Sequence, residues 1–202
     1  MEMTGEQLIP APQQETWEAL NDPAVLKQCV PGCESIDPIG ENQYQVLMVA
    51  RVGPVSAKFK GKLTLSDIKA PDSYSIAFEG QGGPAGFAKG GAQVRLFSET
   101  NAQTRLSYDV KASVGGKLAQ IGSRLVDAAA RKVADDFFRN FNEKVGALHA
   151  APGHEVGAEH EEHRIEPVPR DPDLPDASDT TLRFFAAGAL VVSVVALLAF
   201  FG

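Results

Sequence analysis

The chain has 202 residues, 44% of them hydrophobic and 22% charged, with a formal net charge of −7. This length and apolar content allow one domain of about 150 residues with a real core, and they exclude collagen-like and wholly disordered chains. Two cysteines are too few for a disulfide scaffold, and the acidic balance predicts no binding to nucleic acid, whose phosphates it would repel.

The charges are unevenly distributed along the chain. Residues 1–148 contain 16 Lys or Arg and 17 Asp or Glu, residues 149–183 contain 3 and 9, and residues 184–202 contain none. The acidic stretch is also rich in proline and almost free of aromatic residues. We therefore predict a folded domain over 1–148, a disordered acidic linker over 149–183 and a C-terminal membrane anchor over 184–202.

The predicted domain begins with an edge strand over 1–8, followed by two short helices, the second over 24–29. From 43 to 114 apolar and polar residues alternate in five runs separated by turn residues, which predicts an antiparallel meander with one apolar face. From 118 to 145 apolar residues recur every three or four positions, as in a long amphipathic helix. The fold class is therefore α+β: a curved antiparallel sheet around one long C-terminal helix, with a cavity expected between them.

The last apolar stretch has the length of a membrane span. Residues 184–201 read FFAAGALVVSVVALLAFF, in which Ser193 is the only polar residue. At about 1.5 Å per residue a helix of this length covers about 27 Å, close to the bilayer hydrocarbon core. Residues 1–8 lack the pattern of an export signal. We therefore expect a tail-anchored protein on the cytoplasmic membrane, with its domain in the cytoplasm and Arg183 marking the cytoplasmic side.

All four histidines lie in the predicted linker. They are His149, His154, His160 and His163, and they are interleaved with glutamates. The HEEH run does not place two histidines four residues apart, as a zinc protease helix requires, so we predict no metal site. The predicted domain then has no histidine to act as a general base near pH 7, and we predict no catalytic residues.

Five stretches of the domain carry a family resemblance: Trp17–Pro23, Val30–Glu34, Phe59–Leu63, Gly116–Leu125 and Phe137–Phe141. They resemble the START-like (SRPBCC) superfamily with its helix-grip fold and, more narrowly, the CoxG family of carbon monoxide dehydrogenase subunits. The resemblance implies a membrane-anchored accessory protein that recruits the cytoplasmic molybdenum-containing carbon monoxide dehydrogenase to the membrane. It also implies an apolar, non-covalent ligand, menaquinone or another respiratory quinone, through which electrons enter the quinone pool.

Inward strand residues and one face of the long helix are the expected lining of the ligand pocket. They are Met48, Phe59, Leu63, Phe78, Leu96, Tyr108, Leu118, Ile121, Gly122, Leu125 and Val126, and ordinary core packing is the alternative for each. Gly122 either lets a flat ring approach the helix or allows close packing of helix on sheet. Phe87, in the glycine-rich segment 80–91, is a candidate lid, although this segment also fits a plain flexible hairpin.

Two cysteines, a group of basic residues and two carboxylates are further candidates for a functional role. We interpret Cys29 and Cys33 as reduced structural thiols, because cytoplasmic thiols stay reduced. A basic patch on the solvent face of the sheet is a candidate contact for anionic lipid or for the dehydrogenase; it comprises Arg51, Lys58, Lys60, Lys62, Arg95, Arg105 and Lys111. Glu34 and Asp109 are the carboxylates considered for chemistry, and structural roles are the alternative for both.

Two other functions stay open at this stage. The first is a pure membrane anchor or docking adaptor whose core is solid and holds no ligand. The second is a START-like enzyme, a cyclase or hydrolase, in which Tyr44, Tyr74 or Tyr108 acts as an acid.

Overall fold

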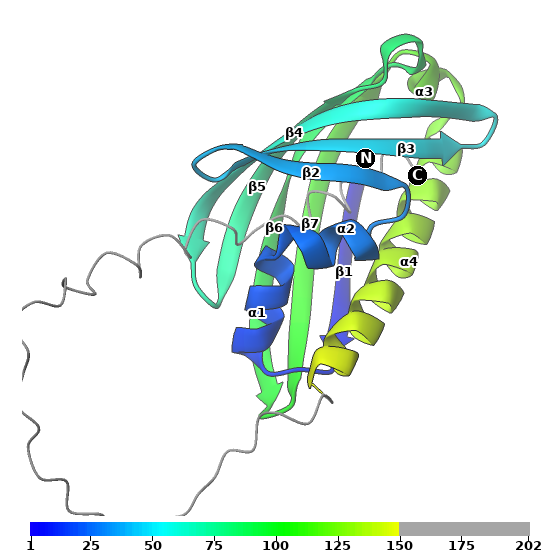
Figure 1. The fold of residues 1–202 in the computed structure, drawn as a ribbon. Helices are drawn as coiled ribbons and strands as arrows, with labels where there is room; N and C mark the ends of the chain where they lie inside the picture. The colour runs from blue at the N-terminus through cyan, green and yellow to red at the C-terminus, as the bar shows by residue number, and fades with distance from the viewer. Residues whose placement is uncertain (150–202) are drawn as a thin grey trace, which may run out of the picture.

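A computed structural model describes residues 1–149, apart from the side chain of Val52, as one curved sheet with helices on one face (Figure 1). Its elements in chain order are β1 (Glu2–Ile9), α1 (Gln13–Asn21), α2 (Pro23–Cys29), β2 (Cys33–Gly40), β3 (Gln43–Val52), β4 (Val55–Lys69), β5 (Ser73–Gln81), the 3₁₀ turn η1 (Gly83–Ala85), β6 (Phe87–Thr100), β7 (Gln103–Gly115), α3 (Lys117–Gln120) and α4 (Ser123–His149).

The seven strands form one antiparallel sheet in the order β1-β7-β6-β5-β4-β3-β2. The predicted meander is confirmed, and the first strand closes it by pairing with the last, with Met3 opposite Val110. Strand β2 has no counterpart among the predicted elements. It buries only Ile36 and carries two register shifts, one of them next to Pro38, so its sequence does not alternate.

Helices α1 and α2 connect the two edge strands and lie on the same face of the sheet as α4 (Figure 1). Pro23 is the first residue of α2, as predicted, and the Asp22 carboxylate caps this helix by accepting a hydrogen bond of 2.7 Å from the Ala24 amide. Further along, the Asn140 amide of α4 donates to the Cys29 carbonyl at 3.0 Å. These contacts fix the short helices against the C-terminal half of α4.

Aromatic rings attach α4 to the sheet. Phe137, Phe138 and Phe141 are at most 2% exposed, and the Phe137 ring lies 5.1 Å from Phe138 and 5.6 Å from Phe141. Phe138 stacks on Tyr108 of β7 at 5.6 Å. The Tyr108 ring in turn lies over Gly5 of β1, where a Cβ atom would come within 2.3 Å of the phenol oxygen. The Tyr108 ring therefore contacts both Gly5 of β1 and Phe138 of α4, which joins β1, β7 and the helix.

The long helix predicted from residue 118 is two helices in the structure. Between α3 and α4, Gly122 has φ +93°, a conformation that favours glycine, and the chain changes direction there. Gly122 is exposed, and a Cβ atom built on it would meet no atom within 4 Å. The interpretation of Gly122 as a position of close packing between helix and sheet is therefore wrong. The approach of a flat ligand ring to Gly122 stays a prediction.

The predicted linker and membrane anchor lie outside the described residues, except for His149, which is the last residue of α4. Within residues 1–149, no helix combines the length and the apolar character that a membrane span requires.

The aromatic contact predicts the effect of one truncation. Phe137→Ala should lower the free energy of unfolding by about 3–5 kcal/mol, because it opens a cavity where a fully buried ring contacts two others. Urea titration followed by circular dichroism measures this change. Leu148→Ala is the matched control on the same helix: this side chain is 56% exposed, so its loss should change stability by less than about 0.5 kcal/mol. Equal effects of the two substitutions would contradict the anchoring role of Phe137.

Candidate functional site

An apolar groove of about 530 Å³ separates the N-terminal half of α4 from strand β3. We name it the helix–strand groove. Its lining residues are Pro31, Gly32, Val49, Ala50, Arg51, Gly53, Leu125, Ala128, Ala129, Lys132, Val133 and Asp136. Two large apolar side chains of this lining are exposed, Val49 at 44% and Leu125 at 51%. A groove that presents aliphatic side chains to solvent favours an apolar ligand or partner.

The sequence of α4 explains why the groove lies at this half of the helix. The C-terminal half of α4 carries the buried phenylalanines, whereas the first ten residues bury only Val126 and Ala130. Ala128 and Ala129 face the groove, and their single methyl groups do not reach across to β3. The helix therefore packs on the sheet at one end and leaves a gap at the other.

The wall opposite the helix is a glycine turn attached to β3. Gly32 has φ +72°, and its carbonyl accepts a hydrogen bond of 2.9 Å from the Val49 amide. A Cβ atom at Gly32 would lie 2.2 Å from the Val49 carbonyl oxygen. Glycine at this position thus allows the turn to contact β3 directly and to form one side of the groove.

The rim of the groove is charged. Asp136 accepts from Lys132 at 2.6 Å and from Arg139 at 2.9 Å. The hydrogen bond from Lys132, together with the nearby positive charges, holds the pKa of the Asp136 carboxyl below its ordinary value. Arg51 adds another exposed guanidinium at the same groove. The site thus combines an apolar interior with cationic hydrogen-bond donors at its edge.

The structure places one of the predicted pocket residues, Leu125, in this groove, with Val126 buried beside it; Ile121 is half-buried at the end of α3. Met48, Leu63 and Leu118 have no exposed surface, so no space large enough for a water molecule adjoins them. The other inward residues are at most 6% exposed: Phe59, Phe78, Leu96 and Tyr108. A ligand-lining role for all of these residues stays a prediction.

Val49, Ala128 and Ala129 line the groove but are missing from the predicted set. Val49 points outward within the run Val46–Ala50, where five consecutive apolar residues interrupt the alternation of β3. Three consecutive alanines, 128–130, widen the apolar stripe of α4 in the same way. These two irregularities are the signals that identify the groove in the sequence.

The glycine-rich segment 80–91 is a tightly closed hairpin. The Gly82 amide donates to the Gly86 carbonyl at 2.8 Å. At Gly86, which has φ +119°, a Cβ atom would lie 2.0 Å from the Gly115 carbonyl oxygen. The hairpin therefore packs backbone against backbone on the end of β7. Phe87 is 46% exposed and lies over Gly115; its role as a lid stays a prediction.

Ion pairs occupy much of the predicted basic patch. Lys58 pairs with Glu34 at 2.6 Å, and Arg95 pairs with Asp109 at 3.7 Å, so both candidate carboxylates have a partner on the surface. Arg105 pairs with two further glutamates. Solvent-exposed pairs of this kind contribute little to stability, but they neutralise the patch locally.

Both cysteines are free thiols. Cys29 is buried and Cys33 is half-buried, and burial raises the pKa of each thiol to about 11 against the weaker, opposing effects of Lys144 and Lys27. The thiols are therefore protonated near neutral pH, which fits a structural role. Within residues 1–149, no three His, Cys, Asp or Glu side chains are arranged to hold a metal ion.

The three tyrosines are weaker acids than free tyrosine. Burial raises the pKa of Tyr44, of Tyr108 and most strongly of Tyr74. Tyr74 is 1% exposed and packs edge to face against Trp17 at 5.4 Å. Its hydroxyl has no hydrogen-bond partner among the described residues. An unpaired buried hydroxyl is costly for stability, and a phenol of raised pKa is a poor general acid near pH 7.

Comparison with known proteins identifies similar chains and folds. Residues 5–146 match the CoxG family of carbon monoxide dehydrogenase subunits. A conserved protein from Geobacillus kaustophilus is 31% identical with a TM-score of 0.69, and the similarity covers 73% of this chain and 96% of that one. None of the curated proteins compared matches this chain.

More distant solved structures share the fold alone. The Zhui aromatase/cyclase from Streptomyces sp. R1128 is 14% identical with a TM-score of 0.57, over 76% of this chain and 98% of that one. A START superfamily protein from Mycobacterium smegmatis is 12% identical with a TM-score of 0.57, over 73% of this chain and 98% of that one. These similarities confirm the predicted START-like sheet and C-terminal helix.

The Tyr74 hydroxyl predicts an unusual substitution. Tyr74→Phe should raise the free energy of unfolding at pH 7 by about 1 kcal/mol, because it removes a buried donor without a partner. Burial raises the folded-state pKa above the unfolded value of about 10, so ionisation of Tyr74 leaves stability unchanged below that pH and lowers it as pH rises further, because the unfolded chain releases the proton more readily. Between pH 10 and 11 the original chain should therefore lose more stability than the variant. Urea titrations at pH 7, 9, 10 and 11 measure both effects, and a variant less stable at pH 7 would contradict the argument.

Proposed function

Because the chain belongs to the CoxG family of carbon monoxide dehydrogenase subunits, we propose that it is an accessory protein that binds menaquinone or another respiratory quinone in the helix–strand groove. In this proposal it also recruits the cytoplasmic molybdenum-containing carbon monoxide dehydrogenase to the membrane, where electrons pass to the quinone pool. The observation that supports ligand binding most directly is the groove itself, which is apolar, open to solvent and lined by small residues of α4.

The groove suits the two chemical parts of a quinone. The methyl groups of Ala128 and Ala129 form a low apolar wall on which a flat ring or isoprene units can lie, and Val49 and Leu125 extend this surface. Burying apolar area contributes about 25 cal/mol per Å². Lys132 and Arg51 are the rim donors for the carbonyl oxygens of the ring. A volume of about 530 Å³ lies within the usual range of ligand sites, roughly 300–1,000 Å³.

A docking adaptor without ligand is the second candidate, and one observation favours it. Met48, Leu63 and Leu118 are completely buried, so the centre of the domain needs no ligand to fill it. An enzymatic role has less support. One protein that shares the fold is an aromatase/cyclase, but residues 1–148 contain no histidine, and burial weakens the tyrosine acids. We propose no catalytic role.

Filling the groove tests the quinone proposal. Ala128→Trp should reduce the quinone that co-purifies with the full chain by about tenfold or more, because an indole occupies the space for the ring while Ala128 itself is exposed and tolerates replacement. Solvent extraction and mass spectrometry of quinone per mole of protein measure this change. Ala147→Trp is the matched control, since Ala147 is also exposed on α4 but does not line the groove.

The outcomes separate the two candidate functions. Full quinone content in Ala128→Trp would place the ligand elsewhere in the protein. If the unsubstituted protein neither retains quinone on purification nor binds added quinone, the docking adaptor is the remaining function.

Removing residues 184–202 tests the proposed membrane attachment. A chain ending at Arg183 should move from the membrane pellet to the supernatant, because this uncharged, mainly apolar stretch is the proposed anchor. Ultracentrifugation of cell lysates followed by immunoblotting measures the distribution. Retention of the shortened chain in the pellet after a high-salt wash would contradict an anchor at this position.

A further inference from the structure

A second concavity, of about 650 Å³, lies among the outward side chains of the sheet, on the face opposite α4. We name it the outer-face groove. Its lining residues are Met1, Glu2, Lys62, Thr64, Ala77, Phe78, Glu79, Lys89, Gly90, Lys111, Ala112 and Ser113. Neither the family assignment nor the quinone proposal accounts for this groove.

The strand register explains the shape of the outer-face groove. Three neighbouring residues on β5, β6 and β7 have their Cβ positions on the core side of the sheet: Phe78, Gly90 and Ala112. They therefore contribute backbone to the groove. A Cβ atom at Gly90 would lie 2.2 Å from the Lys111 carbonyl oxygen, so glycine allows β6 and β7 to approach closely at this point. The groove therefore has a floor of peptide backbone and walls of outward side chains.

The walls carry cationic and hydroxyl donors. Lys62 and Lys89 stand in register on either side of Glu79, two strand spacings apart, which is about 10 Å. Within residues 1–149, neither of these lysines has a carboxylate oxygen within the 4.0 Å of an ion pair. Thr64 and Ser113 add hydroxyl groups to the same groove. Lys111 is already paired with Glu2 at 3.4 Å.

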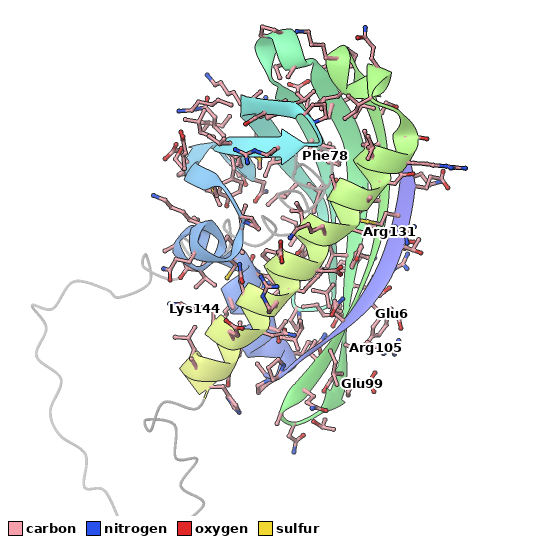
Figure 2. All side chains as sticks on the ribbon, turned by 90° about the vertical axis from the view of Figure 1, so that its right-hand side faces the viewer. Glu6, Phe78, Glu99, Arg105, Arg131 and Lys144 are labelled. Carbon is pink, nitrogen blue, oxygen red and sulfur yellow. The ribbon has the colours of Figure 1, made fainter. Side chains whose placement is uncertain are left out.

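Two arginines elsewhere on this sheet face are neutralised by carboxylates. Arg105 pairs with Glu6 and Glu99, and Figure 2 shows these three residues grouped toward one end of the sheet, away from Phe78 at the outer-face groove. Arg95 pairs with Asp109. Lys62 and Lys89 differ from these arginines in that they share a concavity and form no ion pair within residues 1–149.

We propose that the outer-face groove binds an anion that carries a phosphate group. A phosphate has several acceptor oxygens around one centre, so it can accept hydrogen bonds from ammonium groups on opposite walls, with Thr64 and Ser113 as further donors. A single carboxylate is less suited to bridging lysines two strands apart. The groove is larger than a phosphate ion, so the ligand is a phosphorylated small molecule or a phosphate-bearing lipid headgroup.

Glu79 and the two lysines should have opposite effects on phosphate binding. Its carboxylate lies between the two lysines and opposes an incoming anion, so neutralising it should strengthen phosphate binding, whereas neutralising either lysine should weaken it. A merely structural role of these surface residues predicts no such opposite effects.

Lysine acetylation of the full chain, read residue by residue by mass spectrometry, provides the measurement. Pyrophosphate as the probe should slow acetylation of Lys62 and Lys89 at least threefold, with no change at Lys27 and Lys144. Glu79→Gln should lower the pyrophosphate concentration required, and Lys62→Gln should raise it, each by roughly three- to tenfold for one charged hydrogen bond at a partly exposed site. Lys60→Gln is the matched control, because Lys60 is an outward lysine of the same strand that does not line the groove.

Vesicles distinguish the two sources of the phosphate. Protection of Lys62 and Lys89 by phosphatidylcholine vesicles containing phosphatidic acid, but not by phosphatidylcholine alone, would assign a lipid headgroup. Protection by pyrophosphate alone would assign a soluble ligand, and either result supports the proposal. Equal protection of all lysines from acetylation would overturn the proposal. It would also be overturned if Glu79→Gln and Lys62→Gln, with circular dichroism unchanged, did not shift the required pyrophosphate concentration in opposite directions.

Discussion

The contact between the aromatic residues of α4 and the sheet is the interaction on which the other features depend. Phe137, Phe138 and Phe141 are almost fully buried, and Phe138 stacks on Tyr108 of β7. Seven strands with one apolar face are unstable in water unless that face is covered, and this helix provides most of the cover. Because the large rings are confined to one half of the helix, the other half is free to stand away from β3. The same distribution of side chains thus produces both the stable core and the open groove.

The helix–strand groove and the outer-face groove have different chemical characters because they lie at different places on the sheet. The first lies between the end of β3 and α4, where apolar residues predominate and only the rim is charged. The second lies among solvent-facing side chains, where lysine, glutamate and hydroxyl groups alternate with buried positions. The contact of the sheet with α4 therefore distinguishes the apolar site from the cationic one, which has no helix beside it.

Much of the fold was predictable from the sequence, and the site was predictable only in part. The alternating runs from 43 to 114 indicate strands because a sheet with one wet face imposes that pattern. Strand β2 gave no such signal, since it buries only Ile36. Leu125 lines the groove, but the periodicity of the helix cannot distinguish an inward residue in solid core from one beside a space. The groove depends on short side chains at Ala128 and Ala129 and on a turn that contacts β3, and these are tertiary effects.

The two ends of α4 have separate surroundings. The Asn142 amide donates to the Leu8 carbonyl at 3.2 Å, and His149 lies 3.0 Å from Glu15 at the start of α1, so the helix ends beside the first turn of the chain. Ala128 lies 21 residues earlier, and at about 1.5 Å per residue this separates the two places by about 30 Å. His149 thus lies at one end of the domain, and the helix–strand groove lies at the other. A ligand bound in the helix–strand groove, as we propose, therefore lies at the far end of α4 from the contact between His149 and Glu15.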